Sequence, residues 1–109
     1  MSRSDAVYVI DILESIDIIF TYLKDKTESD FTKDRILQDA VIRRFEIIGE
    51  ASSKISESFK LANREIEWRL MKAMRNKLIH EYFGVSATTI FHTVTINLPL
   101  LKSQLQKIV

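Results

Sequence analysis

Residues 67–84 read EWRLMKAMRNKLIHEYFG, and the spacing of their apolar side chains predicts one amphipathic helix. At about 100° per residue, these side chains share one arc of the helix. They are Trp68, Leu70, Met71, Met74, Leu78 and Ile79. Gly84 follows, and glycine is the usual residue where a chain turns out of a helix. We therefore expect a helix from about Glu67 to about Phe83, with its apolar arc in the core.

Arg75 is the anomaly of this helix, because it lies inside the apolar arc. A buried unpaired charge is very costly, so its guanidinium must reach solvent, pair with an acid such as Glu46 or Glu50, or lie between subunits. His80 and Tyr82 fall in the last turn, and Arg75 and His80 project at roughly 140° to each other. A site that uses both side chains must therefore lie beside the helix end, against another helix or subunit.

Composition describes an ordinary globular chain of 109 residues, which we interpret as one domain over residues 1–109. The net charge of +1, from 16 basic and 15 acidic residues, gives no bulk attraction for nucleic acid. The absence of cysteine excludes disulfides and thiolate catalysis, and the two histidines are too far apart to predict a metal site. We predict neither a metal nor a cofactor.

The N-terminal residues lead directly into an amphipathic segment that carries Asp11, Glu14 and Asp17. This pattern predicts neither a signal peptide nor a membrane span, and the expected compartment is the cytoplasm. The whole chain holds two glycines and one proline, so it should form long helices with few breaks.

Apolar periodicity predicts a first helix from about Asp5 to Lys24, capped by Ser4 or Asp5, and a polar loop over residues 24–30. A second, long helix should run from about Thr32 to about Phe59. Its expected inward residues are Ile36, Leu37, Ala40, Val41, Phe45, Ile48, Ala51, Ser52, Ile55 and Phe59.

Gly49 lies in the middle of that second helix, where glycine costs about 1 kcal/mol relative to alanine. The small residues Ser52, Ser53 and Ser56 follow it. We interpret this segment as the place where a neighbouring helix crosses closely; the alternative is a glycine without a packing role.

Residues 60–66 form a short connection into the helix of residues 67–83, and Ser86 can cap a further helix that reaches about Lys107. Pro99 removes one helical hydrogen bond, so it should kink this last helix or split it. His92 is interpreted as structural. The predicted fold is all-α: a four-helix up-and-down bundle with a kinked last helix.

Arg75-x4-His80-x-Tyr82 resembles the motif of the HepT-type toxins of the HEPN superfamily. Further matching segments make the resemblance cover nearly the whole chain. They are residues 40–43, residues 47–51, Trp68, residues 75–85 and residues 98–100. The chain departs from the family pattern at Glu67, Ser86 and Phe91, positions that concern helix starts and packing.

The resemblance implies an all-helical homodimer in which two copies of the motif face one another across a cleft. It also implies a metal-independent ribonuclease that acts as the toxin of a toxin-antitoxin pair. The antitoxin would be a minimal nucleotidyltransferase of the MntA type, which would neutralise the toxin by transferring AMP to Tyr82.

The implied reaction is attack of an RNA 2′-hydroxyl on the adjacent phosphodiester, which needs proton transfer and a cation for the charge that develops on phosphorus. His80 suits the proton transfer, because an imidazole titrates near neutrality. Arg75 can hold two phosphate oxygens at once. Asn76, one turn before His80, would orient it or bind the substrate.

Each of these residues also has an ordinary alternative role. His80 could be a helix cap or a surface residue, Arg75 an ion-pair partner, and Tyr82 an amphipathic packing residue. The chain could accordingly be a non-catalytic helical module that binds a nucleotide or its cognate nucleotidyltransferase.

An RNA backbone would need a local basic patch, because the net charge supplies none. Arg69 and Lys72 share the polar side of the helix with Asn76 and His80 and are candidates for this contact. Arg43, with Arg44 beside it, is a weaker candidate on the preceding helix. The alternative is that all these side chains lie on an ordinary solvated helix face and do not contact RNA.

Overall fold

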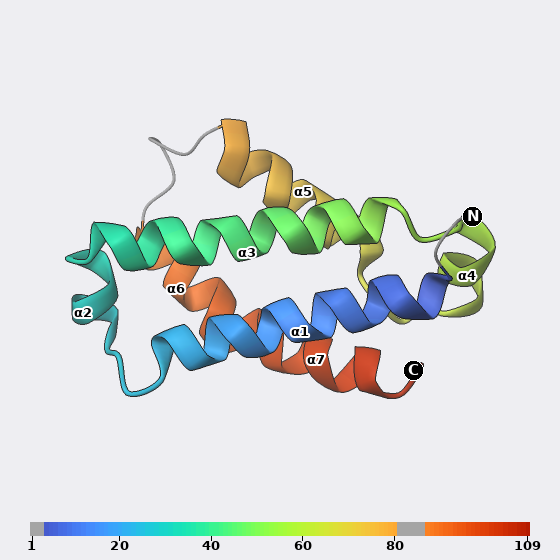
Figure 1. Cartoon of the computed structure of the whole chain (residues 1–109), viewed down its shortest axis with the longest axis horizontal. Helices are drawn as coiled ribbons and strands as arrows, with labels where there is room; N and C mark the ends of the chain where they lie inside the picture. Colours follow the sequence, from blue (N-terminus) through green and yellow to red (C-terminus); the bar gives the residue numbers. More distant parts are fainter. Residues whose placement is uncertain (1–3, 81–86) are drawn as a thin grey trace.

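The computed structural model describes residues 4–80 and 87–109, and these residues form helices and no strand (Figure 1). In chain order the segments are α1 (Asp5–Leu23), α2 (Glu28–Thr32), α3 (Arg35–Ser53), α4 (Glu57–Ala62), α5 (Trp68–His80), α6 (Ala87–His92), the π-helix η1 (Thr93–Asn97) and α7 (Leu98–Gln106). The all-α prediction is therefore confirmed, although the described residues contain more segments than the four helices predicted.

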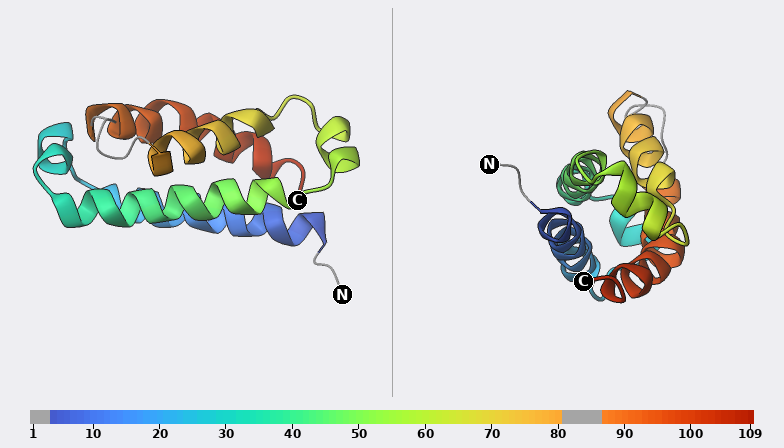
Figure 2. Two further views of the ribbon diagram at one scale, coloured as in Figure 1. Left: turned by 90° about the horizontal axis from the view of Figure 1, so that it is seen from above. Right: turned by 90° about the vertical axis from the view of Figure 1, so that its right-hand side faces the viewer.

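The long segments alternate in direction and form two layers (Figures 1 and 2). α1 and α3 lie antiparallel in one layer, and α5 lies with α6, η1 and α7 in the other. The core lies between these layers. Its fully buried large side chains are Val9, Ile12, Ile16, Ile19, Phe31, Val41, Ile48, Leu98 and Leu105.

The first helix matches its prediction closely. The side chain of Ser4 accepts a hydrogen bond from the Val7 N–H at 3.4 Å, so Ser4 is the cap. Asp5, the other predicted cap, instead accepts hydrogen bonds from the backbone N–H and the hydroxyl of Ser56, at 2.9 and 2.7 Å. The start of α1 is thereby joined to the start of α4.

The prediction of one long helix from Thr32 to Phe59 is wrong, because α3 begins only at Arg35 and ends at Ser53, and a separate helix, α4, begins at Glu57. Asp34 accepts from the Leu37 N–H at 3.0 Å and starts α3, while Ser56 accepts from the Phe59 N–H at 3.3 Å and starts α4. Short polar side chains of this kind offer backbone groups an alternative to a continuous helix. Ile36, predicted to face inward, lies in the first turn of α3 and is 83% exposed.

The predicted loop over residues 24–30 is also partly wrong, since α2 begins at Glu28. Thr27 and Asp30 form a capping box, in which each side chain accepts a hydrogen bond from the other residue's backbone, at 3.1 and 2.9 Å. This short helix buries Phe31 against Phe91, with ring centroids 5.9 Å apart.

The last helix has its irregularity just before Pro99, the residue predicted to disturb it. The N–H of Leu98 bonds to the carbonyl of Thr93, five residues earlier, and residues 93–97 form one π-helical turn. Proline has no N–H with which to continue the normal ladder. The hydroxyl of Thr95 donates to the Phe91 carbonyl at 3.1 Å, so it satisfies one of the carbonyl groups in this region.

Two side-chain contacts connect the C-terminal helical segments to the remainder of the fold. Lys102 reaches Asp17 of α1 at 2.7 Å, and His92 reaches Glu28 of α2 at 2.8 Å. The contact of His92 agrees with the structural role predicted for it. Among the described residues, no helix combines the length and apolar character required to span a membrane.

Candidate active site

Helix α5, which carries the motif, is fixed at its first turn by Trp68. The indole is 8% exposed, its Nε1–H donates to the Asn63 carbonyl at 3.1 Å, and it packs edge-on against Phe59. Met71 is buried one turn later. Leu70, predicted to lie on the same inward arc, is 43% exposed, so the buried arc of α5 is narrower than predicted.

The close helix crossing predicted at Gly49 is confirmed, and the residue that crosses there is Arg75. A methyl group added to Gly49 would come within 2.6 Å of Cδ and 2.8 Å of Cγ of Arg75, and closer still to its Cβ. Only hydrogen at position 49 leaves room for this aliphatic stem. The glycine in α3 therefore determines how deeply Arg75 lies between the two helices.

The guanidinium of Arg75 is held by its neighbour Asn76. Nε and Nη2 donate to the amide oxygen of Asn76 at 3.2 and 2.8 Å, and the pair is partly buried. No described carboxylate forms an ion pair with Arg75, so the alternative in which it pairs with Glu46 or Glu50 is not the one found among the described residues. Glu46 pairs with Arg43 at 3.4 Å, and Glu50 pairs with Lys54 at 3.9 Å.

This arrangement gives Asn76 a role other than the one predicted. Its amide oxygen accepts from Arg75, and so it positions the guanidinium. Arg75 keeps its Nη1 group outside this interaction, which leaves hydrogen-bond donors for an anion such as a phosphate. A cation that is pinned without a carboxylate retains its full charge for such a ligand.

The other half of the motif is only partly described. His80 is the last residue of α5 in the described range, which places its backbone one turn beyond Asn76. Its side chain, Tyr82 and Gly84 lie outside the described residues, as does the predicted helix end at Phe83. The catalytic role of His80 and the modification of Tyr82 stay predictions.

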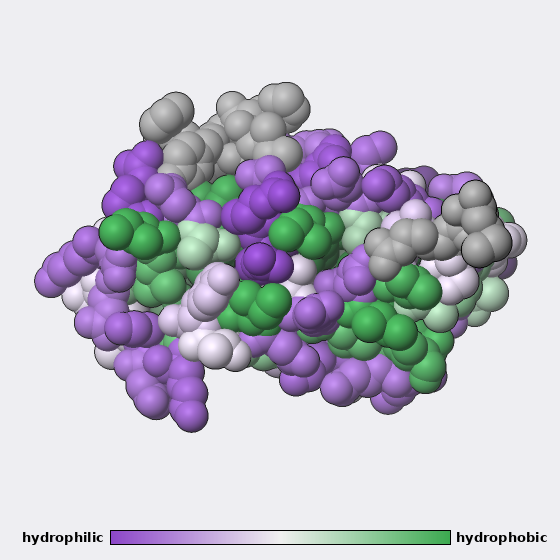
Figure 3. All heavy atoms as spheres, viewed as in Figure 1, coloured by the Kyte–Doolittle hydropathy of each residue, from purple (hydrophilic) through white to green (hydrophobic). Residues whose placement is uncertain are grey.

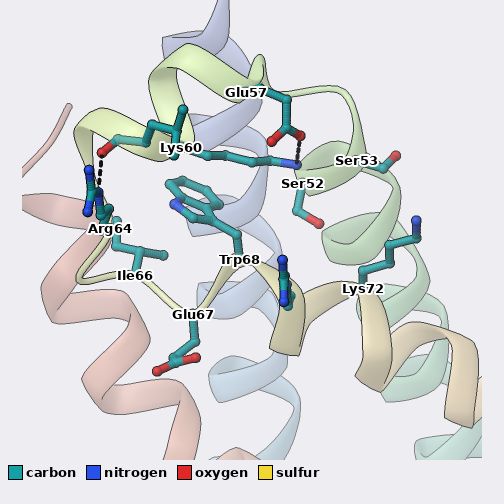
Figure 4. Close-up of a pocket in the computed structure, with 11 residues that line it drawn as sticks. Ser52, Ser53, Glu57, Lys60, Arg64, Ile66, Glu67, Trp68 and Lys72 are labelled. Atoms are coloured by element: carbon teal, nitrogen blue, oxygen red, sulfur yellow. Dashed lines mark hydrogen bonds and ion pairs between the residues drawn. The ribbon is translucent and has the colours of Figure 1, made fainter.

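The basic residues predicted to contact RNA lie in two places. Arg69 and Lys72 are exposed and line a pocket of about 420 Å³ at the elbow between α4 and α5 (Figure 4). Lys60 and Arg64, which sequence reasoning assigned only to a connection, line it too. Arg43 lies on α3 in its ion pair with Glu46.

A second, apolar groove lies beside α5, between it and the π-helix and α7. Its volume is about 210 Å³ and its lining is largely hydrophobic. Its exposed hydrophobic members are Leu70 (43%), Ile96 (69%) and Leu100 (63%), and the polar residues Glu67 and Asn97 are exposed beside them. Over the part of the chain that is described, no three His, Asp or Glu side chains gather in a way that could hold a metal ion.

Comparison with known proteins places the chain in a family. Residues 12–108 match the HepT-like family, described as "Ribonuclease HepT-like". The chain is 44% identical over 108 residues to a Thermococcus cleftensis protein named "Probable ribonuclease HepT", covering 99% of this chain and 98% of that protein.

Two further relatives agree with this result. A Methanocaldococcus jannaschii protein named "Gamma-glutamylcyclotransferase and putative RNase MJ0434" is 44% identical over 99% of this chain, which spans 49% of that protein. A Caldanaerobacter subterraneus protein named "Putative RNase TTE0752" is 36% identical over 93% of this chain and 90% of its own length. No solved structure matches significantly. The match over residues 12–108 and the full-length likeness to these proteins show that the chain belongs to the HepT-like family of the HEPN superfamily.

Proposed function

We propose that this protein is a ribonuclease that cleaves RNA by attack of a 2′-hydroxyl on the adjacent phosphodiester. Family membership supports the activity, and relatives named as ribonucleases match almost the whole chain. The observation that carries the mechanism is Arg75, whose aliphatic stem lies against Gly49 and whose guanidinium is held by Asn76 and paired with no described carboxylate. Such a group is suited to a phosphate.

In the proposed reaction, a bond forms between the 2′-oxygen and phosphorus while the bond to the 5′-oxygen breaks. The His80 imidazole accepts the proton of the 2′-hydroxyl, and a water molecule gives a proton to the departing 5′-oxygen; the imidazolium then returns its proton to solvent. Arg75 stabilises the negative charge that develops on the phosphoryl oxygens. The products are a 2′,3′-cyclic phosphate and a 5′-hydroxyl, and the step requires no metal ion.

The test is cleavage of an RNA oligonucleotide by the purified protein in EDTA, with the products identified by mass. We expect a cyclic phosphate from the wild type and no cleavage by His80→Ala. Arg75→Lys should also be inactive, because lysine keeps the charge but cannot hold two phosphate oxygens or the Asn76 amide in the same way. Cleavage that persists in His80→Ala would refute this chemistry. A protein that binds nucleotide without any turnover would instead support the binding-module alternative.

We propose further that the ribonuclease acts as a homodimer. The apolar groove beside α5 supports this proposal, because Leu70, Ile96 and Leu100 leave an uncovered hydrophobic strip next to the helix that carries Arg75. A second copy on this strip, related by a twofold axis, would bring two α5 helices into proximity. The two motifs could then share one cleft.

We also propose that the protein is the toxin of a toxin-antitoxin pair, neutralised by a cognate MntA-like nucleotidyltransferase that adds AMP to Tyr82. The support is the resemblance of the Arg75–Tyr82 motif to the HepT-type toxins. Incubation with the partner, ATP and magnesium should add the mass of AMP to Tyr82 in the wild type. Equal labelling of Tyr82→Phe would exclude this acceptor.

A further inference from the structure

The pocket at the α4–α5 elbow lies outside the motif and has no role in the reaction proposed above. Its lining comes from the end of α3, from α4, from residues 63–67 and from the first turns of α5. Figure 4 shows Lys60 crossing above the Trp68 ring, with Lys72 and Arg64 on opposite sides of the opening. The pocket is open to solvent and holds about 420 Å³.

The charge of this pocket favours an anionic ligand. Four basic side chains line it (Lys60, Arg64, Arg69, Lys72) against two acidic ones (Glu57, Glu67). Glu57 is already engaged by Lys60 at 3.7 Å. Arg69 and Lys72 are exposed and form no ion pair with any described residue. The pocket therefore carries a greater excess of positive charge than the whole chain, whose net charge is +1.

The elbow that forms this pocket is held by several hydrogen bonds. The carbonyl of Asn63 accepts both from the Trp68 indole at 3.1 Å and from the Ile66 N–H at 3.2 Å. The Arg64 Nε–H donates to the Leu61 carbonyl at 3.4 Å, and Gln104 of α7 donates to the Glu65 carbonyl at 3.3 Å. The basic side chains thus project from a fixed backbone.

A polar row on α5 connects the pocket to the motif. Arg69, Lys72 and Asn76 are spaced by three and four residues, so they share one side of the helix, and the His80 position continues the row. The rise from Arg69 to His80 is about 16 Å at about 1.5 Å per residue. A stacked strand rises about 3.4 Å per nucleotide, so about five nucleotides cover this length.

We propose that the elbow pocket is a second RNA-backbone subsite, which holds phosphates about five nucleotides from the one that is cleaved. This inference rests on the proposed ribonuclease function and extends it from the scissile phosphate to the length of RNA recognised. An acidic protein surface is the competing ligand. The row along α5 favours RNA, because it leads from the pocket to the Arg75–Asn76 pair.

The experiment uses Trp68, the only tryptophan of the chain, as a reporter inside the pocket. A decamer of 2′-O-methyl RNA, which lacks the attacking hydroxyl, is titrated into the full-length protein while Trp68 emission is recorded. We expect the emission to change and saturate. A dinucleotide, too short to reach from the motif to the pocket, should bind more weakly and change the emission less.

The test variant is the double substitution Arg64→Gln/Lys72→Gln. The matched control is Lys26→Gln/Lys33→Gln. It also removes two exposed charges, but near α2, at the far end of the molecule (Figure 1). The test variant should bind the decamer about tenfold more weakly, the loss for two exposed ion pairs. Its plot of log affinity against log salt should be shallower by about 1.4, at about 0.7 for each phosphate contact. The control should bind as the wild type does, and circular dichroism should show both variants folded.

Cleavage assays separate this inference from the proposed function. For each variant, kcat/KM for the decaribonucleotide is divided by kcat/KM for the dinucleotide. The subsite is supported if this ratio is lower for the test variant than for the control. If the test variant cleaves both as the control does, the subsite is refuted while the nuclease stands. Binding at Trp68 without cleavage by the wild type would refute the nuclease and support an RNA-binding pocket. If the test variant loses binding to polyglutamate, used as an acidic polypeptide probe, and binds the decamer as the control does, the RNA subsite is overturned.

Discussion

At the scale of single residues, the contact between Gly49 and Arg75 determines where the reactive cation lies. The close approach of the two helices leaves no room for a methyl group at position 49, because Arg75 Cγ and Cδ would lie 2.8 and 2.6 Å from it. Arg75 then reaches Asn76 instead of a carboxylate. The charge that a phosphate needs is thus positioned by one residue without a side chain and one with a neutral side chain.

Gly49→Ala should therefore lower both stability and RNA cleavage. Overpacking costs about 1–3 kcal/mol, and alanine recovers about 1 kcal/mol of helix propensity, so the net effect should be a modest loss of unfolding free energy. Cleavage should fall more steeply, because Arg75 must move. Thermal denaturation and the cleavage assay measure the two effects. Ser103→Ala, on the exposed face of α7, serves as the control for propensity alone; a Gly49→Ala protein more stable than wild type would contradict the tight crossing.

Asp5 gives the protein a specific sensitivity to acid. Hydrogen bonds from the Ser56 N–H and, second, from the Ser56 hydroxyl lower the pKa of Asp5 below its ordinary 3.8, against a small opposing effect of burial. Because the folded pKa is the lower one, the stabilisation is fully present above about pH 4 and is lost as the pH falls through the folded pKa. Asp5→Asn should make stability less dependent on pH below about 4.

Urea denaturation at pH 5 and at pH 3 measures this effect as a difference between wild type and Asp5→Asn. Glu14→Gln, at an exposed position of the same helix, is the comparison variant. Asp30 also has a lowered pKa, caused first by the Thr27 N–H and then by the Thr27 hydroxyl, and it adds to the acid sensitivity of both proteins. Identical pH profiles for wild type and Asp5→Asn would show that the tie to Ser56 contributes nothing.

At the scale of helices, polar caps decide where the segments begin. Asp34→Ala removes the acceptor for the Leu37 N–H at the start of α3 and should cost about 1 kcal/mol of stability. Asp34→Asn, which keeps a capping oxygen, should retain most of it. Chemical denaturation of the two variants side by side is the measurement. Equal stability of the alanine and asparagine variants would show that α3 does not depend on this cap.

Periodicity predicted the helices well where one face is continuously apolar. α1 matched nearly to the residue, and the last helix was placed correctly with a disturbance near Pro99. The breaks in the predicted second helix were missed because Asp34 and Ser56 are also acceptable on a helix surface. The cap of α4, Ser56, also donates to Asp5, a partner 51 positions away that no local pattern can reveal.

The candidate site was predictable to a similar degree. The isolated glycine signalled a close crossing, and the position of Arg75 in an apolar arc signalled an unusual environment. The Arg75–Asn76 pairing could not be foreseen, because adjacent residues on a helix project in different directions and long side chains decide which of them meet. Lys60 and Arg64 were missed as well, since only the folded elbow brings α4 beside the first turn of α5.

At the scale of the whole molecule, hydrophobic surface is distributed unevenly. Figure 3 shows hydrophilic side chains along the upper right and apolar side chains gathered at the lower right, over α1 and α7. The groove beside α5 contributes a further apolar strip, with Ile96 and Leu100 more than half exposed. Contiguous apolar surface of this kind marks places where another surface binds.

Leu100→Glu should therefore convert the proposed dimer to a monomer and reduce RNA cleavage, because it would bury a charge in the dimer interface. Ile36→Glu is the matched control, since Ile36 is 83% exposed at the start of α3. Analytical ultracentrifugation gives the mass of each variant. A wild-type protein that sediments as a monomer at every concentration, or a Leu100→Glu variant that is still a dimer, would show that this groove is not the dimer interface.

The apolar groove beside α5 also links dimer formation to the stability of the fold. If a second copy covers it, each association event withdraws folded chains from the unfolding equilibrium, so the melting temperature rises with protein concentration. A chain made in small amounts would then be open to proteases, and one made in excess would be resistant. The amount synthesised, as well as any chemical modification, would decide how long the nuclease persists.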